Sequence, residues 1–190
     1  MSEDQCLAGD WGGQGYRDGA QGLPMSRLSA HAEACAKHGV VPEEAPYRSG
    51  RQDGLLVYCT RERGFQEGRE GDSYHQVCPA DLERDFLPAY EDGRIVHAAE
   101  SALESAISSL NGYASRLEEL DDKIEAKRRE CADDDLSQEE RQRACQRIGE
   151  LRNEREQNRR AWREAERAAE WAEREAREVR YRFAGRYGYW

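Results

Sequence analysis

The sequence of 190 residues contains few of the side chains that build a hydrophobic core. Leu, Ile, Val and Phe together number 26, about 14% of the chain, whereas charged residues make up 36%. Chains in which these four residues fall below roughly 20% often bury too little apolar surface to fold as ordinary globular domains. A conventional globular enzyme of this size is therefore not expected.

Long apolar runs and an excess of basic residues are also missing. No stretch approaches the ~18 apolar residues of a membrane span, and the net charge is −10. Binding to nucleic acid phosphates needs clustered Lys and Arg, which an acidic chain does not supply. The sequence therefore predicts neither a transmembrane segment nor a nucleic-acid partner.

Glycine and proline are unevenly distributed along the chain. All five Pro and 13 of the 17 Gly lie in residues 1–94, which carry 10 basic and 17 acidic residues. Residues 95–190 carry 19 basic and 22 acidic residues in a mixed pattern, which is typical of long solvated helices. We expect two domains, a Gly- and Cys-rich head in residues 1–94 and a helical segment in residues 95–190.

The second domain contains two runs with apolar residues seven positions apart, which predict two coiled-coil helices. A short acidic turn separates them, and Ser137 and Glu140 have the spacing of a capping box. The first run contains Leu103, Leu110, Leu117, Ile124 and Cys131, with Ala106, Tyr113 and Leu120 interleaved. The second contains Leu151, Asn158, Ala165, Ala172 and Val179, with Ile148, Arg155, Trp162, Ala169, Ala176 and Phe183 interleaved.

These two runs fit an antiparallel arrangement. Pairing 124 with 151, 117 with 158, 110 with 165, 103 with 172 and 96 with 179 keeps the sum of residue numbers constant, as antiparallel helices require. The numbers of Cys131 and Cys145 sum to one more than this constant, which places the two cysteines opposite each other beside the turn. The sequence predicts a long antiparallel coiled-coil hairpin that projects from the head. The hairpin would serve either as a structural spacer or, through its exposed face, as a docking surface for a protein partner.

In the head, the motif GYRDG at residues 15–19 reappears as GRQDG at residues 50–54, with a weaker echo at residues 90–94. Glycines four residues apart leave a flat groove on a helix, into which another backbone packs closely. We therefore expect an all-α head packed through glycine.

Residues 26–38 predict a short helix capped by Ser26 and ended by Gly39, and residues 64–73 predict an irregular loop. The glycine spacing does not fit the dinucleotide fingerprint or the P-loop, so no nucleotide cofactor is expected.

The six cysteines form an even set, which in an oxidising compartment predicts up to three disulfides. The hairpin register favours Cys131 with Cys145 and proximity favours Cys59 with Cys78, which leaves Cys6 with Cys35. The alternatives are a zinc site and a nucleophilic cysteine. His31, Cys35 and His38 share one helical face and would ligate zinc, and Cys35 or Cys78 beside a histidine would act as nucleophile. We favour disulfides, since they use all six cysteines, and expect no metal.

Several residues beside the glycine repeat are candidates for binding or chemistry. Asp18 and Asp53 occupy equivalent places in the repeat and would form the carboxylate pair of a hydrolase. Trp11 and Tyr58 would serve as aromatic platforms if the head bound cell-wall glycan. Our main expectation is a non-enzymatic interaction protein, with most of the aromatics in the core. Its candidate partner-binding residues are Trp11, Asp18, Tyr47, Arg51, Asp53 and Tyr58, together with the terminal aromatics Tyr189 and Trp190, which would dock a partner or fold back onto the head.

The head also carries five short segments in a characteristic order. They are CLAGDW from Cys6, GYRDG from Gly15, YRSGRQDGLLVYC from Tyr47, YHQVCP from Tyr74 and FLPAY from Phe86. With these segments, residues 6–96 resemble domain-of-unknown-function family 2799.

The resemblance implies a small bacterial envelope lipoprotein, periplasmic and anchored to the outer membrane. In that compartment, the partner implied by the long hairpin would be an envelope protein. It implies that Cys6, Cys35, Cys59 and Cys78 are structural, and it supplies no catalytic mechanism. Residues 1–5 contain no basic stretch, apolar core or lipobox. We therefore expect the signal and the lipid anchor to lie outside this chain.

Overall fold

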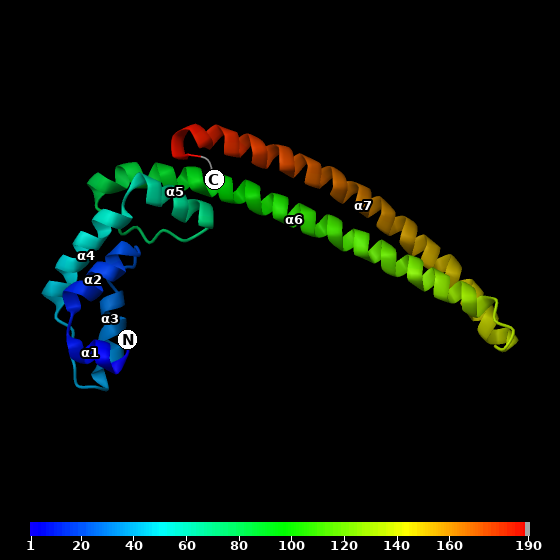
Figure 1. The fold of residues 1–190 in the computed structure, drawn as a ribbon, viewed down its shortest axis with the longest axis horizontal. Helices are drawn as coiled ribbons and strands as arrows, with labels where there is room; N and C mark the ends of the chain where they lie inside the picture. The colour runs from blue at the N-terminus through cyan, green and yellow to red at the C-terminus, as the bar shows by residue number, and fades with distance from the viewer. Residues whose placement is uncertain (189–190) are drawn as a thin grey trace. The chain divides into compact units, whose positions relative to one another are not determined.

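The computed structural model describes residues 1–188, and within them it contains seven helices and no strand (Figure 1). Five short helices precede two long ones. They are α1 (Glu3–Ala8), α2 (Trp11–Ala20), α3 (Arg27–Ala36), α4 (Glu44–Tyr58), α5 (Arg61–Glu70), α6 (Ala80–Cys131) and α7 (Gln138–Tyr187). The predicted all-α fold with a long helical hairpin is confirmed. None of the helices in the described part of the chain has the length and apolar character that a membrane span requires.

The chain divides into two compact units. The head unit comprises Met1–Ala98 together with the end of α7 from Arg182 onward, and the hairpin unit comprises Ala99–Tyr181. The sequence division, which gave all of residues 95–190 to the hairpin, does not include this return of the chain to the head. Its physical cause is aromatic packing, because Phe183 is buried and the Tyr187 ring stacks on Phe65 with centroids 4.0 Å apart.

In the hairpin unit, α6 and α7 lie side by side and antiparallel (Figure 1). Ile124 and Leu151, the predicted pair nearest the turn, belong to one buried cluster with Leu120 and Ile148. The predicted capping box forms at the start of α7. The Ser137 backbone N–H donates to Glu140 Oε2 at 2.9 Å, and the Glu140 N–H donates to Ser137 Oγ at 3.4 Å.

The predicted seam residues are all buried or half-buried except Tyr113, which is exposed. Ala114 takes the seam position in its place, so the buried stripe steps by four residues from Leu110 and then by three to Leu117. A straight α-helix repeats every 3.6 residues and drifts away from a strict heptad in this way. Asn158 fixes this region by donating from Nδ2 to the backbone oxygen of Tyr113 at 2.9 Å.

One local expectation for the head is wrong, and the expected bounds of one short helix are right only in part. Residues 64–73, expected to form a loop, lie largely within α5, which Thr60 caps by accepting a hydrogen bond from the Arg63 N–H at 3.2 Å. Ser26 is the N-cap residue of α3, as expected, but its side chain makes no capping bond because its own backbone is already helical. Gly39 has the positive φ of +70° expected of a stop, although α3 ends three residues earlier, at Ala36.

The three disulfides join the pairs that the spacing predicted. They are Cys6–Cys35, Cys59–Cys78 and Cys131–Cys145. Each could stabilise the fold by ~3 kcal/mol, mainly by restricting the unfolded chain, and so offset the small apolar content.

Candidate functional site

Helices α2 and α4 pack backbone to backbone through their glycines. A Cβ added to Gly15 would overlap the carbonyl oxygen of Tyr47, and a Cβ added to Gly54 would overlap the carbonyl oxygen of Tyr16. The two copies of the sequence repeat are therefore the two sides of one contact, and the expected packing through glycine is confirmed. Because protein backbone covers these glycines, they offer no cradle for a phosphate.

Helices α5 and α6 pack in the same way. A Cβ on Gly68 would overlap the carbonyl oxygen of Tyr90, and a Cβ on Gly93 would overlap that of Phe65. The glycine that follows α2 also corresponds to the glycine that follows α5. Gly22 and Gly71 both have positive φ and would meet the rings of Tyr58 and His97, respectively.

These matches reveal an internal duplication of the head unit. Positions in α2 correspond to positions in α5 that lie 49 residues later, as Gly15 does to Gly64. Positions in α4 correspond to positions in α6 that lie 39 residues later, as Gly54 does to Gly93. The sequence repeat at residues 90–94 is part of this duplication. The glycine spacing of Gly64 and Gly68 was the signal that the sequence reasoning missed.

A buried polar cluster centred on Asp18 joins the helices of the first repeat. Tyr47 donates its hydroxyl to Asp18 Oδ2 at 2.6 Å, and His31 Nε2 lies 2.7 Å from the same oxygen. Gln14 donates from Nε2 to Asp18 Oδ1 at 2.9 Å. Burial, reinforced by the bond to Asp18, raises the pKa of Tyr47 far above its usual value. The cluster ties α2, α3 and α4 together, and it encloses its carboxylate within the protein.

Arg51 closes the end of this first repeat. Its Nε and Nη2 both donate to the backbone oxygen of Leu23, at 3.1 and 2.7 Å. Burial lowers the pKa of the Arg51 guanidinium. This residue therefore anchors the turn after α2 and does not present its charge to a ligand.

The second repeat holds an equivalent buried acid. Glu67 accepts a hydrogen bond from the Tyr58 hydroxyl at 3.2 Å and pairs with Arg63 at 2.7 Å. Burial raises the pKa of Glu67, against the opposing charge of Arg63. Asp18 and Glu67 are 49 residues apart, which is the spacing of the duplication.

The structure places most predicted partner-binding residues of the head in the core. Trp11, Asp18, Tyr47 and Tyr58 are each at most 4% exposed, and Arg51 is half-buried. They are core residues because the glycine contacts draw their helices together, and so they do not form the predicted binding surface. Tyr189 and Trp190 lie outside the described residues.

Both alternative functions lose their key residues. Asp53 is exposed on α4 while Asp18 is enclosed by His31 and Tyr47, so the proposed carboxylate pair of a hydrolase does not form. The aromatic platforms of the glycan-binding alternative, Trp11 and Tyr58, are covered by protein.

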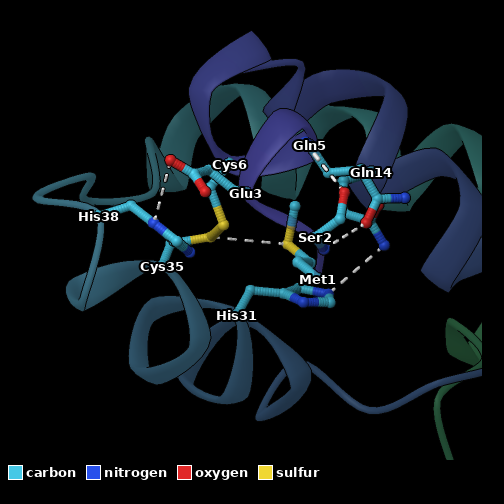
Figure 2. Close-up of a disulfide and its surroundings, with 9 residues drawn as sticks. All are labelled: Met1, Ser2, Glu3, Gln5, Cys6, Gln14, His31, Cys35 and His38. Carbon is cyan, nitrogen blue, oxygen red and sulfur yellow. Dashed lines mark hydrogen bonds and ion pairs between the residues drawn. A yellow bond between two sulfur atoms is a disulfide. The ribbon is translucent and has the colours of Figure 1, made fainter.

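The zinc and nucleophile interpretations both require a free cysteine thiol, and Cys35 and Cys78 have none because each forms a disulfide. Figure 2 shows Cys35 bonded to Cys6, with Met1 beside this disulfide. The Met1 sulfur lies 4.0 Å from the Cys35 sulfur. The Nδ1 atom of His38 lies 3.7 Å from Glu3 Oε1, so this side chain faces a carboxylate of α1. Cys78 is likewise bonded to Cys59. A disulfide sulfur supplies neither a thiolate ligand nor a nucleophile. Within residues 1–188 no group of three or more metal-binding side chains gathers.

The end of α7 covers one face of the second repeat, where it borders an open pocket of about 400 Å³. Tyr187 stacks on Phe65 and donates its hydroxyl to Asp92 Oδ2 at 2.7 Å. Arg186 donates to the same oxygen at 2.6 Å. The pocket is lined by Glu62, Phe65, Gln66, Arg69, Glu70, Arg186 and Tyr187. Tyr187, which precedes the terminal aromatics, therefore folds back onto the head unit, which is one of the two alternatives considered for the aromatic tail.

Residues 10–95 match the family model described as "Protein of unknown function (DUF2799)". The matched range contains α2 to α5 and the start of α6, so it includes both glycine-packed helix pairs. Neither the curated proteins nor the solved structures include a match to this chain. The resemblance predicted from the motifs is confirmed over residues 10–95, which match the model of this family of proteins of unknown function.

Proposed function

We propose that this chain is a non-enzymatic interaction protein of the bacterial cell envelope, and that its helical hairpin docks a protein partner. The observation that carries this proposal is the exposure of large apolar side chains on the hairpin helices. Trp171 is 60% exposed and Tyr181 is 82% exposed on α7, and Ile107 is exposed on α6. Aromatic side chains are enriched at the centres of protein interfaces, where they carry much of the binding energy.

Contacts between the two helices hold the hairpin in a fixed shape for docking. Arg155 donates two hydrogen bonds to Asp121, at 2.6 and 3.1 Å, and Arg180 donates one to Glu100 at 2.9 Å. The Cys131–Cys145 disulfide fixes the register beside the turn. A surface that is already ordered loses less conformational entropy on binding, which favours its use as a docking surface.

The disulfides support the proposed compartment. All six cysteines are paired, and disulfides persist in oxidising compartments such as the bacterial periplasm. Together with the family resemblance, this supports a periplasmic protein that is held at the outer membrane by a lipid anchor.

Site-specific photocrosslinking in the native cell tests the docking surface. A photoreactive amino acid replaces Trp171 in one strain and Glu173 in a matched control. The two residues are both exposed, and they lie about 200° apart around the helix. We expect a discrete adduct from position 171 that position 173 does not give. In a further strain the photoreactive amino acid replaces Tyr181, and adding Trp171→Ala to that strain should weaken the same adduct. Equal adduct yields from positions 171 and 173 would contradict the proposal.

A separate measurement tests the compartment. Cells are fractionated and their thiols alkylated with and without reductant before the intact mass is measured. We expect six protected cysteines in the periplasmic or membrane fraction. Free thiols in a cytoplasmic fraction would refute the localisation without bearing on the hairpin surface.

A further inference from the structure

The two repeats of the head unit carry equivalent faces that differ in one respect. The first-repeat face consists of Tyr16, Asp53 and Val57, and the second-repeat face consists of Phe65, Asp92 and Val96. Each residue of one face corresponds to a residue of the other by the spacings of the duplication, 49 and 39 residues. Both faces therefore present an aromatic ring, a carboxylate and a valine.

The backbones that carry the two faces have the same geometry. Gly54 lies against the carbonyl oxygen of Tyr16, as Gly93 lies against that of Phe65. In both repeats the aspartate and the valine are four residues apart, which places them on one side of their helix. The aromatic residue of the neighbouring helix lies beside them in both cases, because the glycine contact fixes the approach of the two helices.

The difference is that one face is covered and the other is open. Phe65 is 5% exposed and Val96 is fully buried, whereas Tyr16 is 45% exposed and Val57 is 54% exposed. Asp92 is half-buried and Asp53 is exposed. Beside the open face, Leu56 adds another apolar side chain that is 60% exposed.

The end of α7 shows which chemistry fits such a face. The Tyr187 ring is parallel to Phe65 within 7°, and its hydroxyl donates to Asp92. Arg186, the preceding residue, gives Asp92 a cationic partner. A helix end with an arginine next to an aromatic residue therefore satisfies both the ring and the carboxylate.

We propose that the first-repeat face binds a helix of a partner protein that presents an arginine next to an aromatic residue, as the end of α7 does on the second repeat. In this complex the ring of Tyr16 stacks on the aromatic residue of the partner helix. Asp53 accepts hydrogen bonds from the arginine and from the aromatic hydroxyl, and Val57 provides an apolar contact. Residues 1–94 carry seven more acidic than basic residues, which favours a cationic helix.

The occupant is a different protein and not a second copy. The α7 end of each chain is already held on its own second repeat. Two first-repeat faces packed together would bring the carboxylates of Asp53 into the same interface without a cation, which is unfavourable. This surface belongs to the head unit and does not depend on the hairpin surface proposed above.

The probe for this site is a fluorescent peptide with the sequence of residues 176–188, stapled to keep it helical, because short helices are marginal in water. Its binding to the whole chain is measured by fluorescence anisotropy. We expect saturable binding that weakens by about tenfold or more in Val57→Glu and in Asp53→Arg. Val41→Glu is the matched control, since Val41 is 82% exposed and lies outside the face. A second control peptide carries Arg186→Glu and Tyr187→Ala and should bind weakly.

Several results would overturn the proposal. No saturable binding at peptide concentrations up to about 1 mM would show that the face does not take this kind of helix. Binding that survives both Val57→Glu and Asp53→Arg would place the peptide elsewhere, for example on the second repeat in exchange with α7. Self-association of the chain that Val57→Glu abolishes would assign the face to a second copy. All the substituted side chains are exposed, so the variants should fold, and circular dichroism verifies this.

Discussion

Tyr58, the last residue of α4, donates its hydroxyl to Glu67 in α5 at 3.2 Å, and so links the two repeats of the head unit. Both side chains are almost fully buried. The ring of Tyr58 also packs over Gly22, where a Cβ would overlap it. One tyrosine therefore completes the first repeat and contacts the buried acid of the second.

Glu67→Gln should flatten the dependence of stability on pH in the acidic range. Burial raises the pKa of Glu67, so the stability linked to its neutral form is present below the unfolded value of 4.5 and is lost as the pH rises through the folded value. The variant keeps an acceptor for Tyr58. At pH 7 it should change the free energy of unfolding by less than about 1 kcal/mol, because the lost pair with the partly exposed Arg63 offsets the gain. Urea unfolding between pH 4 and 7 measures this, and a wild-type slope in the variant would contradict it.

Alkaline pH should destabilise the head unit. Burial raises the pKa of Tyr47 and Tyr58 far above 10, and it raises the pKa of Tyr74 to about 12. Their neutral forms stabilise the fold fully below pH 10, and this stability is lost as the pH rises through the folded values. The loss is up to ~1.4 kcal/mol per pH unit for each tyrosine that ionises only on unfolding. Unfolding followed by circular dichroism, with tyrosinate absorbance, measures it. Tyr47→Phe should reduce the slope, and constant stability from pH 9 to 12 would refute the prediction.

Gly15→Ala should destabilise the head unit by about 3 kcal/mol, because the added methyl group overlaps the Tyr47 carbonyl and forces α2 and α4 apart. Gly12→Ala in the same helix is the control. Its Cβ would meet no atom closer than 3.8 Å, so it should be neutral or stabilise by up to ~1 kcal/mol through helix propensity. Thermal unfolding distinguishes the two variants. Equal effects of both would show that the glycines are not needed for close packing.

Under native conditions a mild reductant should open the Cys131–Cys145 disulfide first. Cys145 is exposed and Cys131 is half-buried, whereas the other four cysteines are at most 8% exposed. Thiol–disulfide exchange needs access to a sulfur atom. Alkylation followed by peptide mass spectrometry gives the order of reduction. Loss of this crosslink should cost the hairpin about 3 kcal/mol. Earlier modification of Cys59 or Cys78 would contradict the expected order.

The sequence by itself determined the hairpin. Its heptad spacing and the constant sum across the turn predicted the antiparallel pairing of Ile124 with Leu151 and the disulfide between Cys131 and Cys145. This worked because a helix period is local, and a short turn leaves two helices one way to pair. The heptad pattern predicted Tyr113 wrongly, because a strict seven-residue repeat drifts away from a helix of 3.6 residues per turn and leaves this side chain exposed.

The glycine repeat likewise predicted close helix packing in the head, but only the tertiary structure decided which side chains it buries. Trp11 and Asp53 both lie near the repeat, yet one is in the core and the other is exposed. Burial depends on which helices meet, and a local pattern does not contain that information. The return of Tyr187 to Asp92 joins residues 95 positions apart, and the open first-repeat face is visible only beside its covered equivalent. The apolar and glycine periodicity of the sequence determined which segments form helices. Contacts between residues far apart in the sequence decided which faces of those helices remain exposed.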